Sequence, residues 1–554
     1  MIVQLENKRL SLTATINKAN PLIVASLIFI ILFLLSFLTR EIRPLACDMG
    51  EFVNNPLRIL YGDLPYKDFW LLFSPGEVYL PALIYRIFGI NTDILRISMI
   101  LFSCLSVFLP FYLGRYLFKS NIHSIILSLL YFFTSVISNY EVPEYIHFYM
   151  FFIFASCIFM IRYFKEMKTR DIFLSGLLIG GAFYFRFYEA GAGLAGLCTS
   201  LLLFVIIEKI SFKKSLSLFS LFVSGTLIPI IITLLFFINM LPTLFRAIVI
   251  ESVSNGTSMS IPYFAQFYES FDLFLKDISL LLVHFGFGSM IELIFHFLKS
   301  LPILFFYLIP FLILPLFIIY IFTKPDKKSF LIAAVFFFWG LFSMPKGFGR
   351  PDLAHLSLPV MPFLVFLYFS VLILNYHDVS TKIKKIYIKL SIGIIAVMSI
   401  MIIMPVFKIM FLIENPIYKV HTLHGTLSYK TQKEAQEVKK VYEYIEKNTR
   451  HGDYIFVTPW DGAPFYVITY RKDPTYYDSM NDLILRPSVE KQENICADIL
   501  SHKTKLIIHS IDWGYDNKPE QKFSVACAYL KNFIENKCDL VEKYDFYSIY
   551  KPRY

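Results

Sequence analysis

The sequence predicts a polytopic α-helical membrane protein that is followed by a small soluble α/β domain. Of its 554 residues, 56% are hydrophobic and only 17% are charged, and the mean hydropathy is +0.59, whereas soluble proteins are about 25% charged. Apolar runs long enough to span a membrane recur along the first 412 residues. The last 142 residues instead hold 20 basic and 20 acidic residues, so we place the domain boundary between residues 412 and 413.

The first apolar run, residues 21–38, carries no charge and follows Lys8, Arg9 and Lys18. Its length and the lack of a small-residue cleavage site favour a spanning helix with a cytoplasmic N-terminus over a cleaved signal peptide. Ten further runs complete the predicted set of about 11 transmembrane helices. The predicted spans are 21–38, 93–114, 122–139, 145–161, 171–188, 191–208, 215–238, 301–323, 329–344, 357–375 and 390–412.

The basic clusters between these spans all fall on the cytoplasmic side if residues 73–88 and 274–297 do not cross the membrane. We therefore expect those two segments to be helices at the outer surface, within or beside outer loops. The first outer loop comprises residues 40–91, and the C-terminal domain, residues 413–554, lies outside. Cytoplasmic loops then explain the net charge of +10, which gives no reason to expect a nucleic-acid partner.

Asp48 and Glu51 form an acidic pair about ten residues after the first span. On a helix, a spacing of three places both carboxylates on one face. Partial desolvation at the membrane boundary can raise a carboxyl pKa and make the group a useful general base. The alternative is structural, since Asp48 could cap a helix or belong to a solvated loop.

Several stretches of the chain resemble one superfamily of membrane enzymes. After the acidic pair come "GDLPYKDF" (62–69) and "SPGEVYLPALIYRIFG" (74–89), and "GLLIGGAFYFRFYEAG", "GRPDLAHL" and "IFVTPWDGAPFYVITYRKDPTYYD" follow later. Together they resemble GT-C glycosyltransferases, most closely the family 39-like branch of protein O-mannosyltransferases and aminoarabinose transferases. Asp48 and Glu51 match the acidic pair of that branch, and Tyr66 and Asp68 belong to the matching loop motif.

The resemblance implies a GT-C-like fold and the transfer of a hexose or pentose from a polyprenyl-phosphate carrier to an acceptor on the outer face. Asp48 would be the base that deprotonates the acceptor, and Glu51 would orient the acceptor or the base. An inverting course is implied, with no cofactor and no metal, in a bacterial inner (plasma) membrane. The acceptor class, whether lipid, glycan or protein, is left open.

The leaving phosphate of such a reaction needs cations to hold it. Arg186 lies fifteen residues past Asp171, so we expect it in the outer part of a span, where burying an arginine is costly and usually functional. Arg350 is the second candidate, because a guanidinium grips phosphate oxygens with two N–H groups. Lys346 is a further candidate that would add positive charge. The structural alternatives are an Arg186–Glu189 ion pair and a local Arg350–Asp352 pair.

A second polar group is predicted on the same side. Glu141, Glu144 and His147 roughly share a helix face, and they could bind acceptor, tune Asp48 or merely cap a helix start. A zinc site is a weaker alternative, because Pro143 interrupts the set. We group Asp352 and His355 with this second site as well. Glycines such as Gly176 and Gly180 are expected to allow close helix packing.

The C-terminal pattern alternates between helix and strand, which predicts a small α/β domain. Helices are expected over 433–448, 488–501 and 519–535, and strands over 454–458, 505–510 and within 539–551. A disulfide among Cys496, Cys527 and Cys538 is possible, but the sequence does not define a pairing.

Three rival functions remain from the sequence. A lipid-linked saccharide transporter or flippase would place charges at the membrane midplane, and a catalytically inactive scaffold would tolerate loss of the acidic pair. A glycan polymerase or ligase that uses a diphosphate donor is the closest rival.

Overall fold

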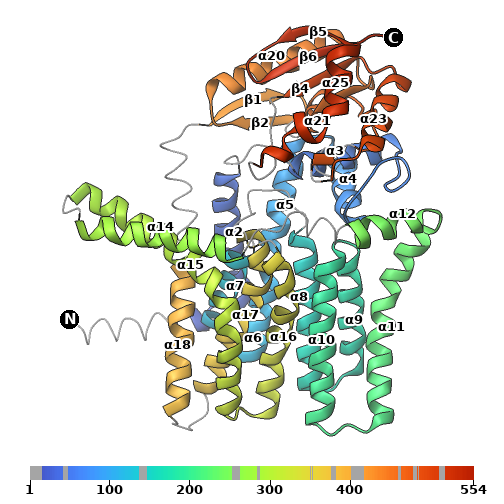
Figure 1. Ribbon diagram of the computed structural model, residues 1–554. Coiled ribbons are helices and arrows are strands. Elements are labelled where there is room, and N and C mark those ends of the chain that lie inside the picture. Colours follow the sequence, from blue (N-terminus) through green and yellow to red (C-terminus); the bar gives the residue numbers. More distant parts are fainter. Residues whose placement is uncertain are drawn as a thin grey trace.

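Long apolar segments form helices that run side by side, as Figure 1 shows for the computed structural model of the chain. Inside hydrocarbon a chain must satisfy its own backbone N–H and C=O groups, which a helix does within one segment. The structure describes residues 15–40, 48–135, 146–251, 263–283, 287–349, 351, 353–375, 382–400, 417–458, 463–477, 483–484, 486–510 and 518–554.

Each of the eleven predicted spans contains helical structure in the part of it that the structure describes, which leaves out residues 136–139, 145 and 401–412. These helices are α2 (Pro21–Thr39), α5 and α6 (Thr92–Ser106 and Phe108–Phe118, one span together), α7 (Asn121–Ser135), α8 (Ile146–Glu166), α9 (Thr169–Phe183), α10 (Phe187–Ile207), α11 (Phe212–Phe236), α15 (Phe287–Phe322), α16 (Lys327–Gly349), α17 (Leu353–Asn375) and α18 (Lys382–Ser399). Within the described residues, eight spans are long and apolar enough to cross a membrane; α7, α9 and α18 are not among them. The polytopic helical fold class is therefore confirmed.

Close helix contacts explain several of the glycines. A Cβ added to Gly176 would lie 2.1 Å from the carbonyl oxygen of Phe222, and one on Gly180 would lie 2.3 Å from that of Thr226. Helices α9 and α11 can approach this closely only without side chains at these positions. In contrast, a Cβ on Gly191 would meet nothing within 4 Å, so that glycine is not needed for packing.

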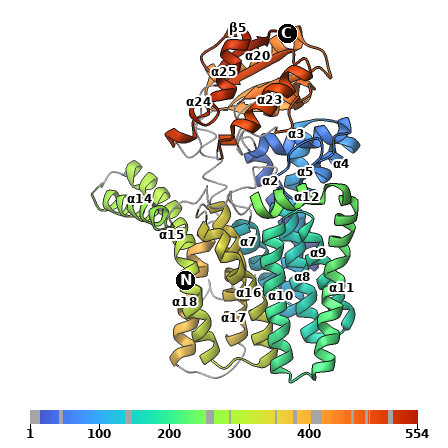
Figure 2. The same cartoon turned by 45° about the vertical axis from the view of Figure 1, so that its right-hand side comes forward.

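The two segments expected not to cross are helical as well. Helix α4 (Gly76–Phe88) has 13 residues, fewer than the 17 or so that a span requires. With α3 (Asp48–Tyr61), it lies between the bundle and the C-terminal domain (Figure 2). Helix α14 (Tyr263–Val283) projects sideways from the same end of the bundle (Figures 1 and 2). We call this end, next to the C-terminal domain, the domain end.

A connecting segment follows α11 at the domain end. It consists of η1 (Ile238–Met240), α12 (Leu241–Phe245) and η2 (Arg246–Glu251). This segment lies beside the first loop, because Phe237, Leu244 and Ala247 share a buried cluster with Tyr66 and Trp70.

The C-terminal domain holds a four-stranded sheet of order β3-β4-β6-β5. Strand β3 (Ile455–Thr458) pairs in parallel with β4 (Leu506–Ser510), and β6 (Tyr547–Pro552) pairs antiparallel with β4 and with β5 (Cys538–Lys543). Its helices include α20 (Gln432–Asn448), α21 (Ala463–Thr469) and α23 (Val489–Ser501). These elements confirm the predicted α/β class, but the boundary at 412/413 lies outside the described residues and stays a prediction.

Two details of this domain differ from expectation. The single helix expected over 519–535 is wrong: η5 (Pro519–Gln521), α24 (Phe523–Ala526) and α25 (Ala528–Lys537) replace it, with a break at Cys527. The hairpin of β1 (Tyr418–Thr422) and β2 (Gly425–Tyr429) was not predicted. Cys496, Cys527 and Cys538 are free, buried thiols, so the possible disulfide is not formed.

Hydrogen bonds join the C-terminal domain to the first loop and to α5. Trp70 N donates to Tyr476 O at 2.8 Å, and Thr92 N donates to His424 O at 2.9 Å. The hydroxyl of Thr426 donates to Asp93 Oδ2 at 2.8 Å. The domain is thus fixed over the end of the bundle where the predicted functional residues gather.

Candidate active site

Arg186 lies at a break between two helices, not partway along one. Helix α9 ends at Phe183 and α10 begins at Phe187, and Arg186 is the extended N-cap residue of α10 with φ −153°. The expectation that a single helix over 171–188 carries it is therefore wrong in its last turn. The short sequence between the helices, rich in aromatic residues, turns the chain and directs this arginine inward.

Glu77 is the direct partner of Arg186. The Nε atom of Arg186 lies 3.1 Å from Oε1 of Glu77, and the two side chains are only 12% and 3% exposed. The guanidinium also lies over the ring of Phe73, 4.2 Å from its centroid. Arg186 also interacts electrostatically with Glu189, the partner that the structural alternative named, whereas the sequence did not single out Glu77.

Gly76 brings Glu77 to this position. Its N–H donates to Tyr184 O at 2.8 Å, and an added Cβ would lie 2.6 Å from that same oxygen. Only glycine lets the N-terminus of α4 contact the α9–α10 break so closely. The "SPGE" sequence is therefore the signal from which Glu77 could have been found.

Glu189 collects the other cations of the domain end. Its buried side chain, in the first turn of α10, interacts electrostatically with Arg186, Lys346 and His355. Lys346 comes from the end of α16, and His355 from the start of α17. We call Glu77, Arg186, Glu189, Lys346 and His355 the charge cluster. Arg186, Lys346 and His355, which the sequence predicted as site residues, are thereby brought together from the start of α10, the end of α16 and the start of α17.

The acidic pair begins a helix, as its spacing suggested. Asp48 is the first residue of α3, and Glu51 follows in the same turn; their side chains lie outside the described part of the structure. Residues Glu141, Glu144, Arg350 and Asp352 also lie outside the described residues.

His147 is buried at the start of α8, with 3% of its surface exposed. Among the residues described here, no group of three His, Cys, Asp or Glu side chains is arranged to hold a metal ion.

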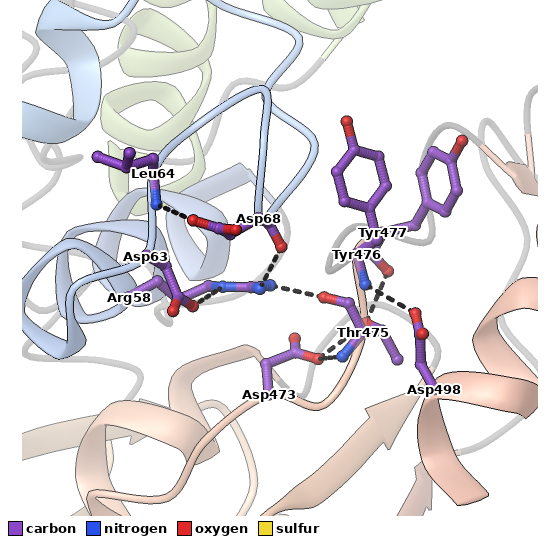
Figure 3. Close-up of polar contacts among 9 residues, drawn as sticks. All are labelled: Arg58, Asp63, Leu64, Asp68, Asp473, Thr475, Tyr476, Tyr477 and Asp498. Atoms are coloured by element: carbon purple, nitrogen blue, oxygen red, sulfur yellow. Dashed lines mark hydrogen bonds and ion pairs between the residues drawn. The ribbon is translucent and has the colours of Figure 1, made fainter. Parts of the chain in front are cut away.

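The loop motif shapes the first loop around Arg58. Tyr66 adopts a positive φ of 68°, and its N–H donates to Phe69 O at 2.8 Å. Asp68 Oδ2 accepts from Leu64 N at 2.9 Å (Figure 3). These contacts close a tight turn, so what the structure shows for Tyr66 and Asp68 is a positioning role in this loop.

Arg58 links this loop to the C-terminal domain. Its Nε contacts Asp63 Oδ2 at 3.1 Å, Nη2 donates to Asp68 O at 3.1 Å, and Nη1 donates to Thr475 O at 2.7 Å (Figure 3). Arginine suits this role because its five N–H donors form a rigid, planar fork. The sequence analysis did not single out Arg58.

The chain thus combines a multispanning bundle, a first loop with two short helices and a C-terminal α/β domain at the end of the bundle that holds the charge cluster. Comparisons with known proteins confirm the resemblance that the sequence predicted. Residues 74–237, less than a third of the chain, match the model of the dolichyl-phosphate-mannose-protein mannosyltransferase family. That segment contains Glu77, Arg186 and Glu189, but neither Asp48 nor Glu51.

Solved structures show the same fold along almost the whole chain. The structure of ArnT from Cupriavidus metallidurans bound to undecaprenyl phosphate matches with a TM-score of 0.57 and 11% identity, over 95% of this chain and 97% of that one. An oligosaccharyltransferase from Archaeoglobus fulgidus matches with a TM-score of 0.51 and 12% identity, over 88% of this chain and 68% of that one. The comparison with curated protein sequences found no match.

Proposed function

We propose that this protein is a glycosyltransferase that moves a sugar from a polyprenyl-phosphate carrier to an acceptor at the outer face of its membrane. The observation that carries the proposal is the charge cluster, in which Arg186, Lys346 and His355 meet two buried carboxylates. Both carboxylates are buried, and ionisable side chains that cluster inside a membrane protein are costly and are a functional-site hypothesis by default. The match to a family of glycosyltransferases includes three members of this cluster.

The proposed chemistry is a single displacement at the anomeric carbon. The acceptor hydroxyl attacks this carbon while Asp48 takes its proton, and the bond between the sugar and the phosphate oxygen breaks with inversion. The leaving polyprenyl phosphate keeps the electron pair as an anion. Arg186 and Lys346, with Arg350, are proposed to stabilise that anion, because donors and charges fixed in advance hold developing charge in a site of low dielectric constant.

Glu77 and Glu189 have a supporting role in this scheme. Without a donor lipid, buried cations need compensating carboxylates, since an unpaired buried charge is strongly destabilising. The carboxylates therefore keep Arg186, Lys346 and His355 in place between turnovers. Glu51 is proposed to orient the acceptor beside Asp48, and His147 belongs to the proposed second site on the acceptor side.

Topology follows from the same proposal. The domain end of the bundle faces away from the cytoplasm, as the basic loops predict, and a bacterial inner (plasma) membrane supplies the polyprenyl-phosphate carrier. Acceptor classes from lipid to glycan to protein are compatible with the site.

The test is the replacement Asp48→Asn, which keeps the size of the side chain but removes the base. Transfer of a labelled sugar from undecaprenyl phosphate in membranes that contain the variant should fall at least about 10²-fold. Asp539→Asn is the matched control, because Asp539 is exposed in the C-terminal domain, where it pairs with Arg553. Near-normal transfer by a folded Asp48→Asn protein would refute the assignment of the base.

A further inference from the structure

A polar cleft separates the first loop from the C-terminal domain, at the far end of α3 from Asp48. Its volume is about 370 Å³, within the range of ligand pockets. The first loop supplies one wall, and three segments of the C-terminal domain supply the other. The lining residues are Arg58, Tyr61, Asp63, Asp68, Tyr454, Lys472, Asp473, Pro474, Tyr476, Asp498 and His502.

The two walls are held in a fixed relation by main-chain and side-chain contacts. Arg58 donates across the cleft to Thr475 O at 2.7 Å (Figure 3). On the domain side, Tyr476 N donates to Asp498 Oδ2 at 3.1 Å (Figure 3). A cleft whose walls are joined this way keeps its shape, which lowers the entropy cost of binding a ligand there.

Aromatic rings face the cleft from both sides. Tyr61 belongs to the end of α3 and Tyr454 to the residue before β3, and Lys472 Nζ lies 4.8 Å and 5.8 Å from their ring centroids. His502 packs on the Tyr454 ring at 4.6 Å between centroids. Rings at both walls offer flat apolar surface, which suits a ligand that has its own apolar C–H faces.

Two buried polar atoms of the lining, Asp473 Oδ2 and the Tyr61 hydroxyl, have no hydrogen-bond partner among the residues that the structure describes. Asp473 is 6% exposed; its Oδ1 accepts from Thr475 N and Oγ1, each at 2.8 Å, and the Tyr466 side chain also interacts with this carboxyl group. Leaving such groups unsatisfied is costly, so a ligand that brings hydroxyl groups gains by supplying the missing hydrogen bonds.

The charges of the lining restrict the ligand further. Four carboxylates, those of Asp63, Asp68, Asp473 and Asp498, outnumber the cations of Arg58 and Lys472. An excess of negative charge disfavours phosphate and carboxylate groups, while carboxylate oxygens are good acceptors for hydroxyl donors. The phosphate of the donor is instead assigned to Arg186 and Lys346 of the charge cluster, as proposed above.

We propose that this cleft binds a neutral, hydroxyl-rich saccharide portion of the acceptor. This inference rests on the proposed function. Thirteen residues of α3 separate Tyr61 from Asp48, which is about 20 Å at 1.5 Å per residue. The sugars bound here are therefore remote from the reacting hydroxyl, which means that the acceptor is an oligosaccharide or a glycoconjugate rather than one small sugar. Remote binding energy of this kind is used to position the reacting group.

Binding to the full-length protein in nanodiscs tests the proposal directly. The probes are maltotriose, cellotriose, mannotriose and N,N′,N″-triacetylchitotriose, with trigalacturonic acid as the anionic counterpart, observed by saturation-transfer NMR. At least one neutral trisaccharide should bind, and trigalacturonic acid should not. Tyr454→Ala should weaken that binding about tenfold. The matched control is Tyr529→Ala, because Tyr529 is 45% exposed on the same domain and does not line the cleft.

A milder variant keeps the proposal testable if Tyr454→Ala does not fold. Tyr61→Phe removes only the unpartnered hydroxyl, and it should weaken the same binding severalfold. Absence of binding by all four neutral probes, binding that survives both variants, or preference for trigalacturonic acid would each overturn the proposal. Because the readout is binding, Asp48→Asn should leave it unchanged, and loss of transfer without loss of binding separates failure of the proposed base from failure of the cleft.

Discussion

Arg186 is the residue on which the charge cluster depends most directly. Its Nε lies 3.1 Å from Glu77 Oε1, and its guanidinium interacts electrostatically with Glu189. Arg186→Gln should lower sugar transfer about 10²-fold and weaken binding of undecaprenyl phosphate, as measured by native mass spectrometry. Arg186→Lys should restore only part of the sugar transfer and of the binding of undecaprenyl phosphate. Lysine keeps the positive charge but lacks the planar guanidinium with its paired N–H donors.

The control for this prediction is Arg170→Gln. Arg170 is 69% exposed at the start of α9, at the opposite end from Arg186, so its loss should leave binding of undecaprenyl phosphate unchanged. Equal effects of the two substitutions would show that Arg186 contributes general charge rather than a specific contact.

At the residue scale, the sequence selected Arg186 and Lys346 as candidates for holding the donor phosphate, and it placed His355 in the second polar group. The structure brings all three near one carboxylate, that of Glu189, while their roles in the reaction stay predictions. Glu77 was missed because its neighbourhood, "SPGEVYL", looks like an ordinary helix start with an acidic first turn. The glycine of "SPGE" is a local signal that a close contact occurs here, but the partner segment lies more than one hundred residues away and cannot be identified from this pattern.

Asp473 should make the stability of the protein depend on pH. Burial raises the pKa of this carboxyl above its ordinary value of 3.8, although Arg58 nearby acts in the opposite direction. A carboxyl group whose pKa is higher in the folded than in the unfolded state binds its proton more tightly in the folded state. The free energy of unfolding therefore falls as the pH rises from about 4 through the folded-state pKa. Asp473→Asn should remove this loss, because its Oδ1 can still accept from Thr475.

Thermal unfolding of Asp473→Asn and of the parent protein between pH 4 and pH 8 checks this. The midpoint of the variant should exceed that of the parent at pH 7, and the gap should shrink towards pH 4. Asp545 gives the opposite case, because its exposed carboxylate pairs with Lys433, which lowers its pKa. Asp545→Asn should therefore not stabilise the protein at pH 7, and a gain there would contradict the explanation.

At the scale of elements, α4 and the α9–α10 break act as one unit. Gly76→Ala places a methyl group 2.6 Å from the backbone oxygen of Tyr184, so α4 must move and carry Glu77 away from Arg186. Overpacking of this kind costs about 1–3 kcal/mol. We expect a lower unfolding midpoint together with a loss of sugar transfer.

Gly191→Ala is the matched control for Gly76→Ala. A Cβ at Gly191 meets nothing within 4 Å, and alanine in a helix interior is favoured over glycine by about 0.5–1 kcal/mol. That variant should be as stable as the parent or more so, with normal transfer. If both alanines behave alike, close contact at Gly76 does not position the site.

The prediction of helices and strands was accurate where the apolar pattern is long and clearly periodic. Within the described residues, all eleven apolar runs contain helices, although the run 171–188 is broken after Phe183, and strands β3 and β4 lie within their predicted runs. It failed at Cys527, where α24 and α25 are separated although the sequence continues in a helical pattern. It also missed the hairpin of β1 and β2, which is stabilised by contacts with α5 and not by a strong turn sequence.

At the scale of the whole molecule, the C-terminal domain is attached through a second ionic contact besides Arg58. Glu251, at the end of η2, has a side chain only 6% exposed, and its Oε2 lies 2.8 Å from Arg486 Nη2 and 4.0 Å from Lys491 Nζ. Its Oε1 accepts from Arg246 Nε at 2.9 Å. One carboxylate therefore neutralises cations from both parts of the chain.

Glu251→Gln should loosen the domain without unfolding the bundle. Removing this buried carboxylate should cost more than the roughly 0–1 kcal/mol of an exposed ion pair, because three cations lose one shared partner. Here three cations would face one another, so repulsion adds to the loss. Hydrogen exchange should accelerate in α23 and around Arg486, while α9 and α10 keep their protection.

Glu443→Gln is the control, because Glu443 is 60% exposed and contacts Lys439 within the same helix; exposed pairs contribute about 0–1 kcal/mol.

The cleft gives a second measurement for Glu251→Gln. Its two walls belong to the two parts that Glu251 joins, so Glu251→Gln should also weaken saccharide binding there while binding of undecaprenyl phosphate at the charge cluster is retained. Unchanged exchange in α23 would mean that Arg58 and the main-chain contacts of Trp70 and Thr92 hold the domain by themselves.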